Sequence, residues 1–260
     1  MDELRNPARE RLAKGELALG LGIRLVRTVE IAKLMKTCGF DWLFLDLEHG
    51  VMALDQASEI SIAALDAGIA PIVRVPRGQY DMAARALDGG AWGIVMPHVD
   101  TAEEAAAMVA HLKYPPEGRR SSGGVLPHFG YRAMKSSDAA QAINAAVLLV
   151  AMIETPLAVA NADRIAAVPG IDALLIGTND LTLEMGISGE LGHKDVVAAY
   201  EAVIAACRRH GKWPGLGGIN VEEHLKRYIA AGVRLVLCGS DLLSLRGAAT
   251  ARATAVRGFL

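Results

Sequence analysis

Short apolar runs alternate with segments of helical spacing along almost the whole chain. Runs that are apolar at every position are typical of strands covered on both faces, as in a parallel sheet flanked by helices. Such runs predict strands at Leu17–Ile23, Trp42–Leu47, Pro71–Val75, Gly93–Met96, Val147–Ile153, Ala173–Ile176, Trp213–Gly217 and Leu235–Cys238. The spacing of apolar residues between these runs predicts helices at Thr28–Thr37, Leu54–Ala67, Tyr80–Leu87, Ala102–Leu112, Pro156–Val168, Asp195–His210, Val221–Ala231 and Leu242–Val256.

Eight strands that alternate with helices predict parallel strands joined by crossover helices. This count favours a closed (β/α)8 TIM barrel over an open doubly wound sheet. No GxGxxG motif follows the first strand and no Walker loop is present, which also disfavours the open sheet. The length of 260 residues suits one barrel of roughly 250 residues. Because no linker or repeat interrupts the chain, we expect a single domain over residues 1–260.

Composition excludes several classes of partner. The hydrophobic share is 52%, the charged share is 22% and the net charge is −2, so we expect neither a nucleic-acid nor a membrane partner. The N-terminal residues Met1–Arg5 are charged and lack the apolar core of a signal peptide. Cys38, Cys207 and Cys238 are odd in number and far apart, which fits neither a disulfide framework nor a zinc site. We interpret them as buried thiols in a reducing cytoplasm.

A long segment without clear periodicity separates the fourth helix from the fifth strand. It runs from Tyr114 to Ser137 and carries Arg119, Arg120 and His128. Long loops in compact domains are usually functional, so we expect this loop to contribute to substrate selection.

Three ionisable residues cluster at the end of the second strand, where barrel enzymes place their chemistry. These are Asp46, Glu48 and His49. His49 is the natural proton carrier near neutral pH. Arg74 ends the third strand and could bind a carboxylate or an enolate oxygen through its fork of donors. A salt bridge between Arg74 and Asp46 across the barrel top is the structural alternative, and both roles can hold together.

Two further carboxylates end the fifth and sixth strands. Glu154 and Asp180 come from adjacent strands, so their oxygen atoms could bind one hard divalent cation, with water or substrate oxygens completing the shell. The alternative is that both residues cap the helices that follow. Thr155 is the better cap before Pro156, which leaves Glu154 free, whereas a capping role for Asp180 stays open.

Other candidates for proton transfer or covalent chemistry are weaker. Asp88 ends the third predicted helix and could orient a histidine, including one across a subunit boundary, although an acid at a helix end is usually solvated. His98 and His128 are more readily explained as structural residues. No lysine lies at the carboxyl end of a predicted strand, which favours metal chemistry over a Schiff base.

Taken in order, several segments resemble the HpcH/HpaI aldolase family, the metal-dependent pyruvate aldolases of the phosphoenolpyruvate/pyruvate barrel superfamily. The resemblance covers nearly the whole chain, from about residue 16 to residue 245. The matching segments are Phe40–His49, Ile72–Pro76, Asp88–Pro97, Val99–Ala105, Tyr114–Gly118, Ile153–Thr155, Gly177–Leu181 and Gly239–Asp241.

The resemblance implies a role for each matched residue. Glu154 and Asp180 would bind a divalent metal such as Mg, Mn or Co. His49 would be the base, supported by Asp88, and Arg74 would stabilise the enolate oxygen. Amides of the Gly177–Asp180 loop would hold the carboxylate of a 2-oxo acid. The resemblance also implies a hexamer, a trimer of dimers, in which the C-terminal helix packs on a neighbouring subunit.

The implied reaction is the formation or cleavage of a 4-hydroxy-2-oxo acid through a pyruvate-type enolate and an aldehyde. Three residues depart from the family pattern. Met152 replaces a usual glutamine, Thr178 replaces a proline, and Asn179 takes the place of a small residue that lines the substrate. The alternatives are another enolate-forming lyase on this barrel, such as a CoA-ester lyase or a 2-oxo-acid decarboxylase, and a non-catalytic relative that binds metal and 2-oxo acid.

Overall fold

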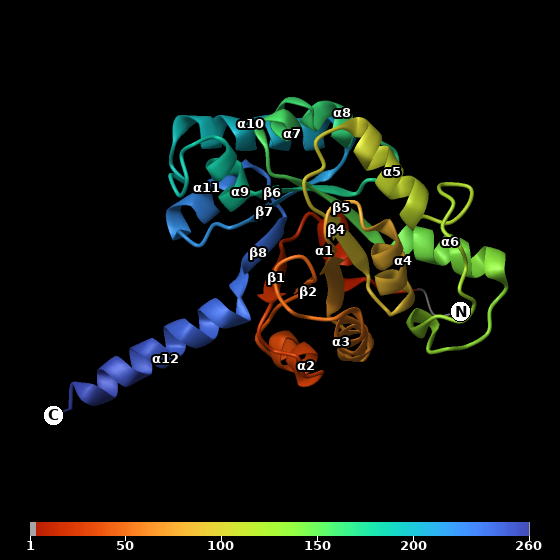
Figure 1. The fold of residues 1–260 in the computed structure, drawn as a ribbon, viewed down its shortest axis with the longest axis horizontal. Helices are drawn as coiled ribbons and strands as arrows, with labels where there is room; N and C mark the ends of the chain where they lie inside the picture. The colour runs from red at the N-terminus through yellow and green to blue at the C-terminus, as the bar shows by residue number, and fades with distance from the viewer. Residues whose placement is uncertain (1–3, 260) are drawn as a thin grey trace.

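Eight parallel strands close into one barrel with helices around it (Figure 1). The computed structural model describes residues 4–259. Neighbouring strands follow chain order, and β8 pairs back with β1. The strands are β1 (Ala18–Ile23), β2 (Trp42–Asp46), β3 (Ala70–Arg74), β4 (Gly93–Met96), β5 (Leu148–Ile153), β6 (Ala173–Gly177), β7 (Trp213–Gly217) and β8 (Leu235–Ser240). The predicted TIM barrel is therefore confirmed, with strand ends that differ from the prediction by at most two residues.

Most of the helices cover the outside of the barrel, while short helices lie at its two ends and α12 projects away from it. They are α1 (Pro7–Ala13), α2 (Glu30–Thr37), α3 (Leu54–Ala67), α4 (Tyr80–Asp88), α5 (Ala102–Leu112), the 3-10 turn η1 (Pro127–Phe129), α6 (Ser136–Ala146), α7 (Pro156–Ala160), α8 (Ala162–Ala166), α9 (Thr178–Glu184), α10 (Lys194–His210), α11 (Glu222–Ala231) and α12 (Asp241–Arg257).

The helix predicted at Pro156–Val168 is wrong, because the chain forms two short helices there. Asn161 lies between α7 and α8, and its side-chain amide donates to the carbonyl of Asp100 at 2.8 Å. This bond ties the junction of the two short helices to the loop after β4. Helices α1, α6 and α9 were not predicted, and α6 occupies residues directly after the long loop.

The amino end of the barrel is closed by α1. Asn6 caps this helix by accepting from the amide of Arg9 at 3.3 Å. Its buried side-chain amide donates to the carbonyls of Trp92 at 3.1 Å and Ala146 at 2.8 Å. These residues precede β4 and β5, so one asparagine ties the N-terminal segment to two strands at the end opposite the carboxyl termini.

Tight packing between β1 and β2 sets the position of the largest core side chain. The indole of Trp42 is fully buried, and its Nε1 donates to the carbonyl of Ala18 at 3.1 Å. A Cβ atom added at Gly20 would lie 2.1 Å from the indole ring. Only glycine leaves room for the ring at this place in β1.

Helix α12 leaves the body of the barrel (Figure 1). Its side chains from residue 242 onward are exposed, including the apolar side chains of Leu242, Leu245 and Val256. Only its first residue, Asp241, is buried. Helix α12 therefore has an apolar surface that no other part of the described chain covers.

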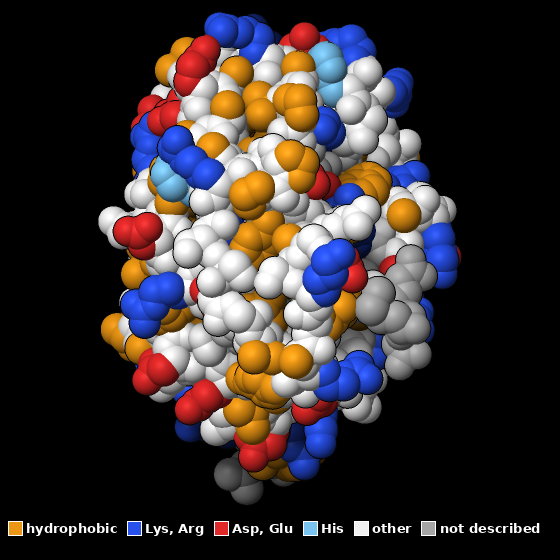
Figure 2. Space-filling model, turned by 90° about the vertical axis from the view of Figure 1, so that its right-hand side faces the viewer, with side chains coloured by type: hydrophobic (Ala, Val, Ile, Leu, Met, Phe, Trp, Pro, Cys, Tyr) orange, Lys and Arg blue, Asp and Glu red, His pale blue; other side chains and the backbone are white. Residues whose placement is uncertain are grey.

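Surface features match only part of the prediction. Cys207 is buried, but the prediction of a buried thiol is wrong for Cys38, which ends α2 and is exposed. The face that carries α4 to α6 mixes positive and negative side chains, and apolar side chains gather along its middle (Figure 2). No helix within residues 4–259 is long and apolar enough to span a membrane. Part of the charged N-terminal segment, residues 1–3, lies outside the described residues.

His128 lies inside the long loop and is a structural residue. Its ring packs on Trp92 with centroids 4.5 Å apart, and its Nε2 lies 3.0 Å from the carbonyl of Ala91. Because a carbonyl only accepts, Nε2 carries the proton, and the buried Nδ1 has no hydrogen-bond partner in the described chain. Burial lowers the pKa of His128 to about 4.

We expect this histidine to make folding sensitive to acid. Between pH 6.5 and 4 the unfolded chain binds the proton more readily than the folded protein, so the free energy of unfolding falls as the pH falls. The contribution of His128 is about 2–3 kcal/mol between pH 7 and 4.5. Urea unfolding of the wild type and of His128→Phe at both pH values measures it. The prediction fails if both proteins lose the same free energy of unfolding over this range.

Candidate active site

The carboxylate of Asp46 organises the end of β2. It is almost fully buried and accepts the backbone N–H groups of Glu48 and His49, each at 3.1 Å. These bonds turn the chain sharply after the strand. Asp46 therefore sets the backbone on which His49 stands.

Arg74 completes this arrangement from β3. Its Nε and Nη2 donate to the two oxygens of Asp46 at 2.9 and 2.6 Å, a bidentate geometry with high directional specificity. Its Nη1 lies 3.1 Å from Glu48 Oε2, and its Cζ lies 5.0 Å from the centre of the Phe44 ring. Burial alone would lower the pKa of Arg74, but the carboxylates of Asp46, Glu48 and Glu154 together outweigh burial and raise the pKa. The salt bridge considered as a structural alternative is present, and Arg74 also lines the cavity.

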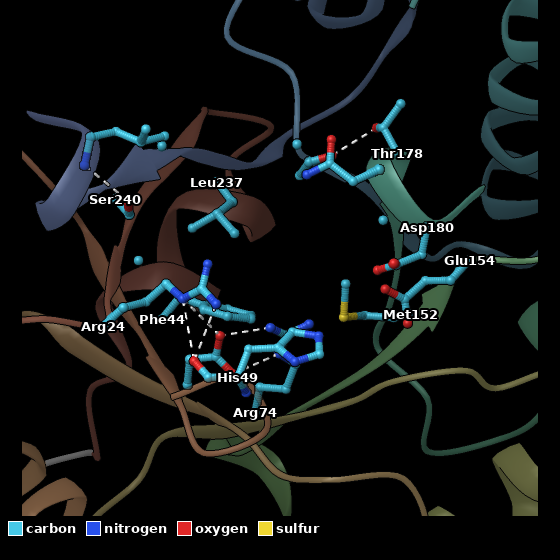
Figure 3. A pocket seen from close by; sticks show the side chains of 18 of the residues that line it. Arg24, Phe44, His49, Arg74, Met152, Glu154, Thr178, Asp180, Leu237 and Ser240 are labelled. Carbon is cyan, nitrogen blue, oxygen red and sulfur yellow. Dashed lines mark hydrogen bonds and ion pairs between the residues drawn. The ribbon is translucent and has the colours of Figure 1, made fainter. Parts of the chain in front are cut away.

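His49 stands at the mouth of the barrel with about half of its side chain exposed. Its Nε2 lies 3.8 Å from Glu48 Oε2. Figure 3 shows the ring directed into the cavity in front of Arg74. A half-exposed imidazole beside a guanidinium can exchange protons with solvent and with a bound molecule.

Glu154 is held by contacts from two neighbouring strand ends. Its Oε2 accepts the backbone N–H of His98 at 2.9 Å. His98 has a φ of 49°, a left-handed conformation that costs a non-glycine residue about 1–3 kcal/mol. A Cβ atom at Gly177 would lie 2.4 Å from Glu154 Oε1. The side chain therefore fits only because β6 ends in glycine.

The prediction that Thr155, rather than Glu154, caps the next helix is confirmed. Thr155 Oγ1 accepts the N–H of Ala158 at 3.0 Å and donates to Asp100 at 2.6 Å. Asp180 lies in the first turn of α9, and Gly177 is the residue before that helix. Figure 3 shows the carboxylates of Glu154 and Asp180 side by side.

These two carboxylates have the properties of a cation site. Burial, and then repulsion from Asp180, raises the pKa of Glu154 to about 7, against the opposing effects of His98 and Arg74. A hard divalent cation, which prefers carboxylate oxygens, would remove that repulsion. Within residues 4–259, no group of three or more His, Cys, Asp or Glu side chains is arranged to hold a metal. The protein would thus supply two ligands and leave the others to water or substrate.

Thr178 lines the cavity, and its hydroxyl also makes hydrogen bonds in the protein core. Its hydroxyl donates to the carbonyl of Gly217 at 2.7 Å, so the Tyr200 hydroxyl, 2.7 Å away, is the donor to Thr178. The Tyr200 ring stacks on Tyr228 with centroids 3.7 Å apart. The departure at Thr178 thus anchors the start of α9 to β7, whereas Asn179 is exposed and lines the cavity.

One cavity of about 190 Å³ brings most of the predicted residues together (Figure 3). A water molecule takes up about 30 Å³ in the liquid, so this volume suits a small acid. The predicted residues that line it are Asp46, His49, Arg74, Met152, Glu154, Gly177, Thr178, Asn179 and Asp180. Glu154 and Asp180 lie on one side, and His49 and Arg74 lie on the other.

Asp88 does not join this cavity within the chain. Its Oδ1 accepts from Arg120 Nη2 at 2.6 Å, and Arg120 also packs over the Tyr114 ring. These residues belong to the side of the barrel that carries the long loop. The predicted pairing of Asp88 with His49 is absent inside the described chain, and a pairing across a subunit boundary stays a prediction.

The lysines lie away from this cavity. Within the described residues, no lysine lines it. Lys113 is buried, and burial lowers its pKa, but its Nζ donates to the carbonyls of Asn144 and Val147. Val147 precedes β5, so Lys113 lies at the amino end of the barrel.

Arg24 is a cavity residue that the sequence reasoning missed. It follows β1 directly, so the strand-end rule that found Arg74 applies to it as well. Its Nε and Nη2 donate to the carbonyl of His49 at 3.3 Å. The amide of His98 was also missed, and residue type offers no signal for a backbone donor.

Comparison with known proteins agrees with this architecture. The family description HpcH/HpaI aldolase/citrate lyase matches residues 26–248. A 4-hydroxy-4-methyl-2-oxoglutarate aldolase of Hapsidospora irregularis is 42% identical, over 91% of this chain and 89% of its own length. A hydroxypyruvate/pyruvate aldolase of Agrobacterium fabrum is 35% identical, over 94% and 89%. The crystal structure of an HpcH/HpaI aldolase from Desulfitobacterium hafniense superposes with a TM-score of 0.91 at 28% identity, with 96% of each chain covered.

The expected enzyme class, a carbon–carbon lyase of the aldolase type, is confirmed by these relatives. The family match includes the carboxyl ends of β2 to β8. The chain belongs to the HpcH/HpaI aldolase/citrate lyase family.

Proposed function

We propose that this protein is a metal-dependent aldolase that forms or cleaves 4-hydroxy-2-oxo acids through a pyruvate-type enolate. The observation that carries the proposal is the pair of carboxylates on β5 and α9 across one small cavity from an imidazole and a guanidinium. Enolate chemistry needs carboxylates that bind a cation, a group that carries a proton, and a positive group that pairs with the enolate oxygen. The aldolase relatives support the same reading.

A divalent cation held by Glu154 and Asp180 would act as a Lewis acid toward the carboxylate and keto oxygens of the substrate. The backbone N–H groups at the start of α9 have no partner inside the helix and can bind the substrate carboxylate. Met152 presents its thioether to the same cavity. The surface next to the two carboxylates is therefore apolar. Mg, Mn and Co remain the predicted cations.

Cleavage breaks the C3–C4 bond of the substrate. The C4 hydroxyl gives its proton to His49, directly or through one water molecule, and becomes the carbonyl of the leaving aldehyde or ketone. The electron pair of the broken bond moves onto the C2 oxygen, giving an enolate, and Arg74 balances its negative charge. Return of a proton to C3 yields the 2-oxo acid. The reverse sequence joins the two fragments.

The other lyase reactions receive less support from the cavity. A CoA ester would need cations for its nucleotide, and among the described residues the walls carry two guanidinium groups, Arg24 and Arg74, and no lysine. A non-catalytic relative has no need for a half-exposed histidine beside Arg74. The cavity therefore supports the aldolase reaction better than these alternatives. A cytoplasmic location stays a prediction.

Chelation should abolish pyruvate release from a 4-hydroxy-2-oxo acid, and Mg, Mn or Co should restore it. Borohydride with pyruvate should leave activity intact, because no lysine forms an imine. Glu154→Gln should lower activity by more than the roughly 10- to 100-fold that loss of an outer-shell partner costs. Exposed Glu59→Gln on α3 is the matched control and should behave as wild type. Activity that survives chelation but not borohydride would refute the proposal.

The contact between Gly177 and Glu154 makes a second test possible. Gly177→Ala forces Glu154 to move, because the new Cβ would lie 2.4 Å from its Oε1. We expect Mn²⁺ affinity, measured by electron paramagnetic resonance, to fall at least about tenfold, as for lost support of a metal ligand. Gly192→Ala is the control, because its Cβ would meet only His224 at 3.4 Å. Unchanged Mn²⁺ affinity in Gly177→Ala would contradict the assigned ligand.

We also propose that α12 packs on a neighbouring copy, within a hexamer. Its residues Leu242, Leu245, Ala249, Ala253 and Val256 recur at spacings of three and four, which form one apolar stripe on a helix. Helices in proteins gain most of their stability from the packing of an apolar face. Since no residue among 4–259 covers the stripe, a second copy is its natural partner.

The stripe predicts which substitutions change assembly. Leu245→Glu should shift the protein to a smaller species in light scattering coupled to gel filtration. Thr250→Glu lies on another side of α12 and is exposed, so it should keep the wild-type mass. An equal mass for wild type and Leu245→Glu would show that α12 is not part of the interface.

A further inference from the structure

The cavity carries a second guanidinium on the wall opposite the two carboxylates. Figure 3 shows the head of Arg24 directed into the cavity, beside His49 and Leu237 and facing Glu154 and Asp180. About half of the Arg24 side chain is exposed. It is thus a charged group at the far end of the space in which a substrate would lie.

The backbone of Arg24 is fixed by a buried carboxylate. Asp241, the first residue of α12, accepts the N–H groups of Arg24 at 3.1 Å, Leu25 at 2.9 Å and Val26 at 2.8 Å. Three such bonds hold the start of the loop after β1. The backbone of Arg24 is therefore held at the cavity by Asp241, whatever conformation the Arg24 side chain adopts.

The guanidinium of Arg24 lacks a strong anionic partner. Its two bonds to the His49 carbonyl are 3.3 Å long, and Asp46 Oδ2 is 3.5 Å away. Both oxygens of Asp46 are already bound by Arg74 at 2.9 and 2.6 Å. One carboxylate thus serves two guanidinium groups, and it binds Arg74 far more closely. Arg24 retains donors for an additional anion.

A second donor comes from β8, the strand that pairs with β1. Ser240 of β8 pairs in register with Gly22 of β1, two residues before Arg24, and lines the same cavity. Its Oγ accepts the N–H of Leu243 at 3.3 Å, which leaves the hydroxyl hydrogen free to donate. A guanidinium and a hydroxyl at one end of a small cavity suit a carboxylate.

We propose that Arg24 determines specificity for substrates with a second carboxylate, on the fragment that leaves as the aldehyde or ketone. This inference rests on the proposed aldolase function and names its substrate class, the 4-hydroxy-2-oxo dicarboxylic acids. The first carboxylate lies at the Glu154 and Asp180 side, the C4 hydroxyl lies near His49, and the second carboxylate meets Arg24 and Ser240. The leaving fragment is then itself a 2-oxo acid such as glyoxylate or pyruvate.

Two substrates that differ at one group test this assignment. 4-Hydroxy-2-oxoglutarate and 4-hydroxy-2-oxopentanoate share every atom except a carboxylate in place of a methyl group on C4. Both release pyruvate, which one coupled assay measures with Mg or Mn present. We expect the wild type to have the higher kcat/KM for the dicarboxylate.

Arg24→Gln should lower the ratio of the two kcat/KM values roughly 10- to 100-fold, the range for a lost hydrogen bond to a charged group. The change should lie mainly in the KM of the dicarboxylate. Arg24→Lys should recover part of the ratio, since it restores the charge but not the fork. Arg27→Gln is the matched control, because Arg27 donates to the Val51 carbonyl at 2.8 Å and does not line the cavity. It should keep the wild-type ratio.

The outcomes separate this inference from the proposed function. If Arg24→Gln slows both substrates by the same factor, Arg24 acts only through the His49 backbone and the inference is wrong. A wild type that prefers 4-hydroxy-2-oxopentanoate also overturns it and leaves the aldolase proposal intact. A wild type that cleaves neither substrate with any of the three cations removes the proposed function, and the inference with it. A phosphorylated aldehyde tested as acceptor for pyruvate separates carboxylate from phosphate recognition, and preference for it would overturn the inference.

Discussion

The buried carboxylate of Asp46 holds in place the residues that form one wall of the cavity. It binds Arg74 twice and accepts the backbone N–H groups of Glu48 and His49. Breaking a buried ion pair by removal of one partner costs about 3–5 kcal/mol, because the other charge is left unpaired. Asp241 has the same function at β1, where it accepts three N–H groups of the loop that begins at Arg24. Two buried aspartates thus fix both loops that carry the charged groups of this wall.

The barrel and half of its cavity follow from simple sequence rules. Continuous apolar runs mark strands buried on both faces, and here their ends fell within two residues of the structure. Because parallel strands all end on one side of a barrel, polar residues at those ends must converge there. This reasoning found Asp46, Arg74 and Glu154, and applied to β1 it would have found Arg24.

What the sequence did not predict depends on contacts between distant segments. Glu154 owes its position to the His98 amide and to the missing Cβ of Gly177, and neither contact leaves a local pattern. Helix α6 has few large apolar residues, so its periodicity is faint. Asn161, at the break between α7 and α8, bonds to the carbonyl of Asp100, which lies 61 positions earlier in the chain. Cys38 was expected inside because cysteine is often buried, but it ends α2 on the exposed side.

Glu154 shows how the site opposes the stability of the fold. Burial and the nearby Asp180 raise its pKa from 4.5 to about 7. Between these pH values the folded protein binds more protons than the unfolded chain, so this group lowers the free energy of unfolding as the pH rises through that window, and the loss persists above it. A cation that binds the ionised pair would reverse the effect, which couples binding to folding. The fold nevertheless holds this carboxylate with a left-handed His98 and with a glycine at the end of β6. Glu154 lowers stability, and yet contacts from two neighbouring strand ends hold it in place. The function of its carboxylate oxygens explains this better than packing does.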